Sequence, residues 1–255
     1  MARGPEKREV VPRPWHTLLD ILFPPQCAGC GKSGVNICPD CMGQVTPVPL
    51  PICRHCGRPW EGPGVCHSCR SCQSQLKAIR SASIYAQPLG KIIWQFKYRN
   101  RRDLARPLGG LLASYWMGHV VPVDIVMAVP LHPTRQRERG YNQATLLAQQ
   151  LCFTARLPLL DAGILQRGRP TTQQASLTRP ERLKNVAGAF QWQGPALSDL
   201  NILLIDDVAT SGATLEACAT VLKGAGAASV RALTVARAGD EYGKIRSSKI
   251  ARVGL

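Results

Sequence analysis

The chain has 255 residues, and its 32 Lys and Arg outnumber its 16 Asp and Glu, which gives a formal net charge of +16. A hydrophobic content of 45% is enough for a sizeable core and excludes a wholly disordered protein. No apolar run approaches the roughly 18 residues of a membrane helix. The apolar patch at 18–23 is too short for a signal peptide, so we expect a cytoplasmic protein with no membrane span.

The positive charge is spread along the chain. Residues 1–80 carry 10 basic and 5 acidic side chains, and residues 81–255 carry 22 and 11. Such a field favours anionic partners, namely nucleic acid, phosphorylated metabolites or an acidic membrane surface. Charge alone is equally compatible with a basic protein that has none of these partners.

Cysteine is concentrated in residues 27–72, which hold nine of the 11. Eight of them form four CxxC pairs, a spacing typical of knuckles that hold structural zinc. The expected ligands are Cys27, Cys30, Cys38, Cys41, Cys53, Cys56, Cys66 and Cys69. We favour sequential pairing into two sites because short loops close at a lower entropy cost, but interleaved pairing stays open. Cys72 is a ninth candidate, either replacing Cys66 or remaining a free thiol.

We expect the zinc to hold the fold rather than to catalyse, because a catalytic zinc keeps an open position. A redox role for the CxxC pairs is the weaker alternative. The expected organisation is an N-terminal extension (1–26), a double zinc ribbon (27–72), a linker (73–81), an α/β domain (82–238) and a basic, disordered tail (239–255).

Strands and helices alternate in the α/β domain. Apolar runs predict strands at 82–85, 125–129, 202–205 and 230–235, and helical spacing predicts helices at 88–98, 104–117, 141–152 and 214–224. This order implies a largely parallel sheet with helices on both faces. Ligands of such sheets bind at the carboxyl ends of the strands.

The segment 202–214 carries the sharpest signal of the chain. The buried strand runs into Asp206 and Asp207, then into a turn of small and hydroxylated residues at the start of a helix. Backbone N–H groups at a helix N-terminus bind phosphate, and the two carboxylates are placed to accept hydrogen bonds from ribose hydroxyls. The expected loop residues are Asp206, Asp207, Ala209, Thr210, Ser211, Gly212, Ala213 and Thr214, with Asp206 and Asp207 as the catalytic candidates.

At this motif the chain resembles the phosphoribosyltransferase superfamily. Over residues 15–238 it is similar more specifically to the ComF/GntX family, in which a double zinc ribbon precedes a type I phosphoribosyltransferase-like domain. The stretches that carry this resemblance, beyond the loop, are 95–98, 129–131, 137–143 and 169–190.

The resemblance implies a ligand such as 5-phosphoribosyl diphosphate, with Mg²⁺ bridging its diphosphate oxygens. Pro130 and Leu131 would form the diphosphate loop, and residues 167–185 the mobile hood. The residues implied beside the diphosphate or in the hood are Arg135, Arg137, Arg139, Arg169, Thr171 and Gln173. A solvated basic turn is the alternative interpretation of the three arginines in 135–139.

The same family is associated with handling of incoming DNA, in natural competence or in the use of DNA as a nutrient. The resemblance therefore implies single-stranded DNA as a partner, together with a DNA-translocating helicase or an uptake-channel protein, and a location in the cytoplasm or at the inner membrane surface. Basic residues interleaved with aromatic ones suit such a strand; the candidates are Lys97, Arg99, Arg101 and Arg102, near Trp94, Phe96 and Tyr98. Phe96 falls on the apolar helix face and is equally well explained as core.

Three functions follow from these observations. The first is DNA handling by a protein that binds a phosphoribosyl ligand. The second is an active, Mg²⁺-dependent phosphoribosyltransferase of nucleobase or nucleotide salvage with no direct DNA role. The third is a metal-stabilised interaction protein with a degenerate site, which the intact loop disfavours.

Overall fold

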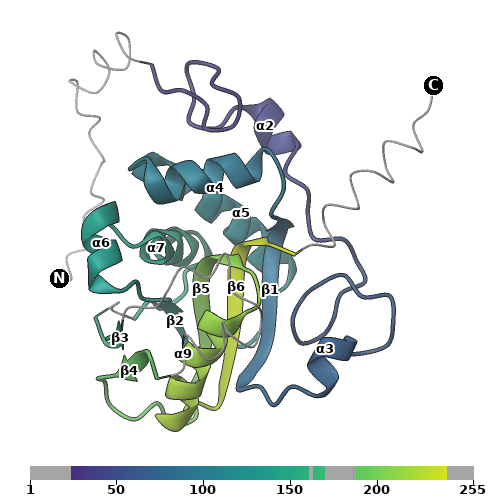
Figure 1. The fold of residues 1–255 in the computed structure, drawn as a ribbon, viewed down its shortest axis with the longest axis vertical. Coiled ribbons are helices and arrows are strands. Elements are labelled where there is room, and N and C mark those ends of the chain that lie inside the picture. Colours follow the sequence, from purple (N-terminus) through teal and green to yellow (C-terminus); the bar gives the residue numbers. More distant parts are fainter. Residues whose placement is uncertain (1–23, 161–162, 170–185, 187, 240–255) are drawn as a thin grey trace, which may run out of the picture.

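The computed structural model describes residues 24–160, 163–169, 186 and 188–239. Its centre is a four-stranded parallel sheet (Figure 1). The strands lie in the order β1 (Leu76–Ile84), β6 (Ser229–Arg237), β5 (Asn201–Ala209) and β2 (Ile125–Ala128). The predicted parallel α/β architecture is confirmed.

The apolar runs form the centre of this sheet because both of its faces are covered. Residues Ile202–Ile205 of β5 are all buried. On one face α5 (Ala105–Gly118) and α7 (Gln143–Ala155) pack against the strands and against each other. On the other face lies α9 (Ala213–Gly224), which also contacts β4 (Phe190–Trp192). The strand β4 forms a short antiparallel pair with β3 (Leu165–Arg167).

Two shorter helices lie near the carboxyl ends of the strands (Figure 1). Helix α4 (Leu89–Tyr98) buries its apolar face, including Phe96, and is followed by the 3-10 turn η1 (Arg102–Leu104). Helix α6 (Pro133–Arg139) follows β2 and ends at Gly140, which adopts a left-handed conformation with φ 74°. Both helices thereby place their C-terminal residues near the carboxyl ends of the strands.

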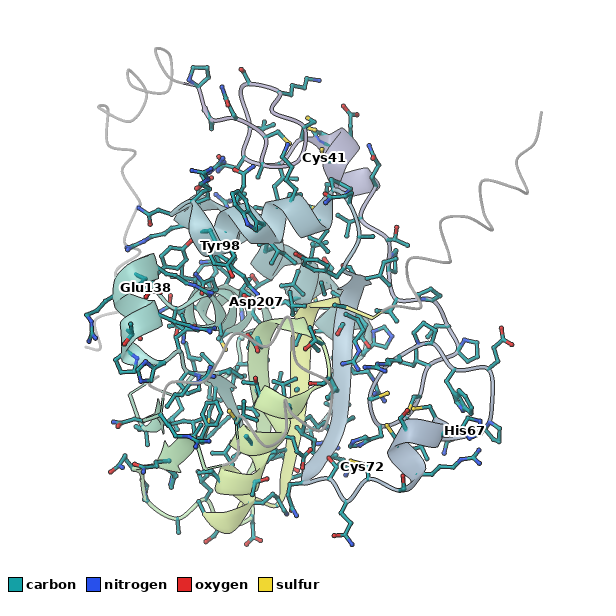
Figure 2. All side chains as sticks on the ribbon, viewed as in Figure 1. Cys41, His67, Cys72, Tyr98, Glu138 and Asp207 are labelled. Carbon is teal, nitrogen blue, oxygen red and sulfur yellow. The ribbon has the colours of Figure 1, made fainter. Side chains whose placement is uncertain are left out.

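The two halves of the cysteine-rich region lie at different places on this body. The first ribbon, with α2 (Pro39–Gly43), sits on α4, and the second, with α3 (His67–Arg70), lies beside β1 (Figure 1). Figure 2 shows the same separation through Cys41 in one ribbon and His67 and Cys72 in the other.

Chain segments of both ribbons pair with the outer side of β1. The Ile79 backbone N–H donates to the His55 carbonyl oxygen at 2.8 Å, and that of Ile84 donates to the Thr46 carbonyl oxygen at 2.9 Å. The residues before the α/β domain are thus attached to the sheet itself.

Several expected boundaries differ in the structure. The expected linker 73–81 is wrong from Leu76 onward, because β1 begins there and its alternating side chains pack on one face. Asp206 and Asp207 lie inside β5, not after it, since β6 pairs with β5 as far as Ala209. The hood residues Thr171 and Gln173, and the tail from residue 240, lie outside the described residues. In the described part of the chain no helix is both long and apolar enough to cross a membrane.

Candidate functional site

The eight expected metal ligands form two tetrads. Cys27, Cys30, Cys38 and Cys41 form one, Cys53, Cys56, Cys66 and Cys69 the other, and within each the sulphur atoms lie within 4.8 Å of one another. This is the sequential pairing that the sequence favoured. Cys72 belongs to neither tetrad.

The chemistry of these sulphurs fits a zinc ion. The Cys38 N–H donates to Cys27 Sγ at 3.2 Å, and the Cys66 N–H donates to Cys53 Sγ at 3.3 Å. Burial alone would raise the pKa of Cys27 and Cys53, but backbone hydrogen bonds outweigh it and lower both to about 6. Burial, followed by hydrogen bonds with neighbouring thiols, raises the pKa of Cys41 to about 12. Four thiolates this close repel one another, so all four cysteines of a tetrad can be deprotonated together only when a cation lies between them.

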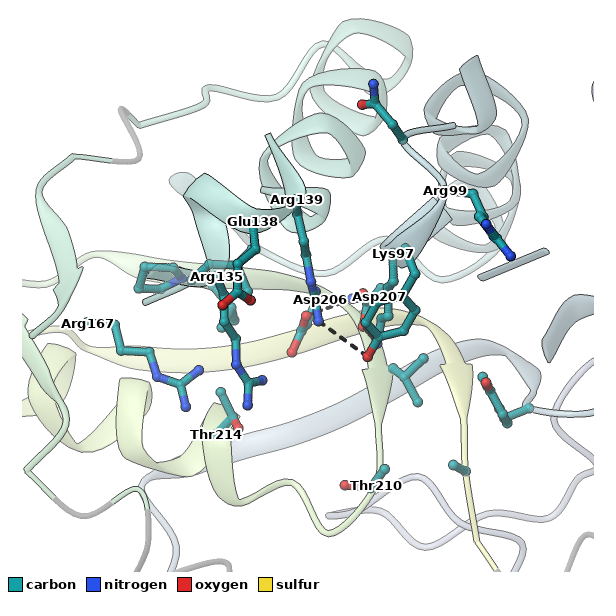
Figure 3. A pocket seen from close by; sticks show the side chains of 18 residues that line it. Lys97, Arg99, Arg135, Glu138, Arg139, Arg167, Asp206, Asp207, Thr210 and Thr214 are labelled. Atoms are coloured by element: carbon teal, nitrogen blue, oxygen red, sulfur yellow. Dashed lines mark hydrogen bonds and ion pairs between the residues drawn. The ribbon is translucent and has the colours of Figure 1, made fainter. Parts of the chain in front are cut away.

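A pocket of about 630 Å³ opens at the carboxyl ends of the strands (Figure 3). Its walls come from the ends of β2 and β5, from the C-terminal residues of α4, from α6, from β3 and from the first turn of α9. The lining residues used below are Lys97, Tyr98, Arg99, Pro130, Leu131, Arg135, Glu138, Arg139, Arg167, Asp206, Asp207, Thr210 and Thr214.

Asp206, Asp207 and Lys97 form the charged centre of this pocket. Lys97 Nζ lies 2.8 Å from Asp207 Oδ1, and the Asp207 backbone N–H donates to Asp206 Oδ1 at 2.8 Å. Removal from water, followed by the negative charge of Asp207, raises the pKa of Asp206 to about 7. Removal from water opposes protonation of Lys97, but the charge and hydrogen bond of Asp207 outweigh it and raise the pKa of Lys97. The pocket therefore holds one firmly paired carboxylate and one that titrates near neutral pH.

Arginines line the other side of the carboxylates. Arg135 and Arg139 are four residues apart and share the pocket face of α6, where Arg139 also donates to Gln143 Oε1 at 3.0 Å. Arg167 reaches the pocket from β3 although only 7% of it is exposed. Burial, and then the charge of Arg135, lowers the pKa of Arg167. Two mutually repelling guanidinium groups beside a cavity favour an anionic ligand.

The loop after β5 supplies the floor of the pocket. Gly212 has φ 84° and is the N-cap of α9, a conformation that glycine adopts without strain. Ser211 Oγ accepts from the Ala213 N–H at 3.3 Å. Thr210 and Thr214 line the cavity at the N-terminal end of α9, where the helix dipole favours negative charge.

The expected site residues divide into three groups. Asp206, Asp207, Thr210, Thr214, Pro130, Leu131, Arg135 and Arg139 line the pocket. Ala209, Ser211, Gly212 and Ala213 shape the loop beside it. Arg137 and Arg169 are exposed and do not line the pocket, and Arg137 Nη2 donates to Thr134 Oγ1 at 3.5 Å.

The four residues expected at a nucleic-acid surface have different surroundings. Lys97 points into the pocket toward Asp207 (Figure 3). Arg101 donates to the Gln26 carbonyl oxygen of the first ribbon at 3.1 Å, and Arg102 donates to the Gly140 carbonyl oxygen at 2.6 Å. Arg99 is exposed and lies 5.2 Å from the centre of the Trp94 ring.

Sequence reasoning missed Arg167 as a pocket residue and Lys97 as the partner of Asp207. Arg167 lies in a three-residue strand with no recognisable periodicity, so nothing local distinguishes it from Arg169. Lys97 had a signal, since it belongs to the family-like helix end 95–98, but its target lies 110 residues further along the chain.

Two protein families match parts of the chain. The Double zinc ribbon domain matches residues 18–73, and the Phosphoribosyl transferase domain matches residues 137–251. The second match extends beyond residue 238, where the sequence resemblance was expected to stop.

Individual relatives match over most of their length. Competence protein F of Haemophilus influenzae is 32% identical over 216 residues, which cover 80% of this chain and 91% of that protein. DNA utilization protein YhgH of Salmonella typhimurium is 31% identical over 193 residues, with 73% and 84% coverage. Competence protein ComFC of Bacillus subtilis is 29% identical over 215 residues, with 81% and 86% coverage. Since this similarity extends through most of each chain, the protein belongs to the ComF family of competence and DNA utilization proteins.

Proposed function

We propose that this chain binds 5-phosphoribosyl diphosphate, or a related phosphorylated ribose, with Mg²⁺ in the pocket at the end of β5. The observation that carries the proposal is the pair Asp206 and Asp207, which line one cavity with Thr210 of the loop after β5 and Thr214 in the first turn of α9. Two adjacent carboxylates at the end of a buried strand are costly unless a ligand or a partner side chain uses them. Lys97 compensates the charge of Asp207 through Oδ1, and the other oxygens of the two carboxylates can accept hydrogen bonds from a ligand.

In this proposal each part of the ligand has its own wall of the pocket. The 5′-phosphate lies against the loop 210–214, and the ribose hydroxyls donate to Asp206 and Asp207. The diphosphate lies between Pro130–Leu131 and the guanidinium groups of Arg135, Arg139 and Arg167, which suit bidentate contacts. Mg²⁺ would neutralise charge on the diphosphate oxygens, and the carboxylates of the pocket are ligands of the type it prefers.

We further propose that ligand binding serves the handling of single-stranded DNA. Support comes from the names of the relatives and from an exposed surface next to the pocket. Trp94 is 45% exposed and Tyr98 58% exposed, and their rings are 6.0 Å apart. Arg99 and Arg139 stack on these two rings. Aromatic rings with adjacent cations suit base stacking and backbone contact, and a DNA-translocating helicase would deliver such a strand.

Phosphoribosyl transfer to a nucleobase is the second candidate function. It is favoured by Asp206, whose pKa of about 7 suits a group that exchanges a proton at physiological pH. Release of diphosphate from the ligand in the presence of a nucleobase would establish this activity. Ligand binding without release of diphosphate favours the role in DNA handling over phosphoribosyl transfer.

The deciding experiment is a calorimetric titration with 5-phosphoribosyl diphosphate and Mg²⁺, with and without single-stranded DNA. We expect binding to the wild-type protein and its loss in the double variant Asp206→Asn, Asp207→Asn, which keeps the side-chain shapes and removes their charge. Glu61→Gln, an exposed site in the second ribbon, is the control. Equal affinities in the wild type and the double variant would refute the assigned pocket.

A further inference from the structure

The second zinc ribbon directly contacts the loop 210–214, which we call the phosphate loop. Arg58 Nη2 donates to the Thr210 carbonyl oxygen at 3.3 Å, which joins residues 152 positions apart. Arg58 lies two residues after Cys56, a member of the second tetrad. A bond to this carbonyl oxygen restrains the peptide that begins the loop and leaves the N–H groups of the loop free of Arg58.

A second connection runs through Ile79 of β1. The knuckle of the second ribbon packs against the backbone of Ile79, with Gly57 against its carbonyl oxygen and the His55 carbonyl accepting its N–H at 2.8 Å. The side chain of Ile79 is 3% exposed, and its Cδ1 would lie 2.8 Å from a Cβ placed on Gly212. Ile79 is therefore enclosed between the ribbon on one side and the loop glycine on the other.

A third connection holds the first turn of α9. Glu216 accepts hydrogen bonds from the Ser74 hydroxyl and from the Gln75 backbone N–H, the latter at 2.6 Å. Both donors belong to the segment that leaves the second ribbon and enters β1. The start of the loop is thus attached to the second ribbon, and the first turn of α9 is attached to the segment that follows this ribbon.

The first ribbon contacts a different wall of the pocket. Its Ala28 carbonyl accepts from Gln95 Nε2 at 2.8 Å, and its Gln26 carbonyl accepts from Arg101. Both partners belong to α4 and the turn after it, on the side of the pocket that supplies Lys97. The two metal sites therefore brace different walls.

We propose that the second zinc ribbon positions the phosphate loop, with Arg58 as the positioning residue, so that the state of this one metal site sets the affinity for the 5′-phosphate. The identity of the ligand in this proposal is taken from the function proposed above, which is the binding of a phosphorylated ribose. An intact knuckle holds Arg58 against the carbonyl oxygen of Thr210 and Gly57 against β1, and thereby fixes the start of the loop. Loss of zinc from the second tetrad releases this brace and leaves the diphosphate wall formed by α6 intact.

The test compares Arg58→Met and Arg58→Lys with Arg54→Met, an exposed arginine of the same knuckle that serves as the matched control. Two ligand fragments, ribose 5-phosphate and Mg²⁺–diphosphate, are titrated into each protein. We expect Arg58→Met to weaken ribose 5-phosphate about five- to tenfold, the worth of one hydrogen bond, and to leave diphosphate affinity unchanged. Arg58→Lys should recover part of the loss.

Equal weakening of the two fragments would overturn the proposal, because a general folding defect lowers the affinity for both. Unchanged affinity for both fragments would overturn it as well, because Arg58 would then have no effect on the loop. Hydrogen exchange of the amides of 211–214 in the ligand-free protein gives a readout that needs no ligand. Arg58→Met should accelerate it and Arg54→Met should not, at equal zinc content; unchanged exchange also overturns the proposal. If the wild type binds neither fragment, the proposed function fails, while the exchange data still decide the role of Arg58.

Discussion

Asp206 has a pKa of about 7 in the folded chain because it has lost water and lies next to Asp207. In the unfolded chain an aspartate titrates near 4. Between these values the folded chain keeps a proton that the unfolded chain has released. The free energy of unfolding therefore falls as the pH rises through this window and levels off above it.

Replacement of this carboxyl should remove that dependence. We expect Asp206→Asn to stabilise the ligand-free protein relative to the wild type, and to do so more at about pH 8 than at about pH 5.5, since only the wild type pays to ionise the side chain. Urea unfolding of both proteins at the two pH values gives the difference directly. A stability difference that stays constant with pH would show that Asp206 is already ionised in the folded chain.

The acidic residues of the site were predictable, and their basic partner was not. Asp206 and Asp207 follow an unbroken apolar run, and one local segment is enough to indicate a strand end with a ligand site. Lys97 lies at the end of a basic helix, where sequence alone suggests a solvent-exposed or DNA-binding face. Its side chain turns toward Asp207 only because α4 lies beyond the carboxyl ends of the strands.

Among the helices and strands, too, some were predictable from the local sequence and others were not. The strand β5 and the helix α9 were predictable because their apolar residues follow the strand or helix period. The helix α6 has no buried residue, and its seven residues between His132 and Gly140 are nearly all polar, so no periodicity marked it. The first half of β1 was mistaken for a linker because Lys77 and Arg80 interrupt its apolar residues. Its strand conformation depends on pairing with β6, the last strand in the described part of the chain, and therefore cannot be recognised from the local sequence.

The ribbons are elements that depend on metal, because few apolar residues lie between their cysteines. Metal analysis of the purified protein should find about two zinc ions per chain, by ligand counting. Cys66→Ser together with Cys69→Ser should reduce this to about one, because the first tetrad is complete on its own. A value near zero in this variant would show that the two sites do not bind independently.

At the scale of the whole molecule, the charge of +16 no longer indicates a single task. Arg135, Arg139 and Arg167 surround the pocket, and Arg101 and Arg102 bond to the chain itself. The remaining candidates for a strand of DNA include Arg99 with the exposed rings of Trp94 and Tyr98. The basic charge is thus divided between a small anionic ligand, internal contacts and a surface near the pocket.

If DNA binds directly at this surface, its affinity should depend on salt. Each phosphate contact that is lost should reduce the slope of log affinity against log salt by about 0.7 for a single strand. We expect Arg99→Ala to weaken binding and reduce this slope, and Trp94→Ala to weaken binding with the slope unchanged. Arg156→Ala, an exposed arginine at the end of α7, is the control. Fluorescence anisotropy from about 50 to about 200 mM salt measures both quantities, and a flat response would exclude direct electrostatic binding.

The pairing of Ile79 with His55 and of Ile84 with Thr46 has a further consequence, because β1 is one of the two outermost strands of the sheet. An uncovered outer strand offers its backbone to another copy of the chain and invites aggregation. Here that strand is shielded by Thr46, which follows the first tetrad, and by His55, which lies inside the Cys53–Cys56 knuckle. Zinc bound at the two tetrads would therefore shield the backbone of β1 as well as hold the shape of the ribbons, and loss of the metal would leave this strand open to strand-to-strand association.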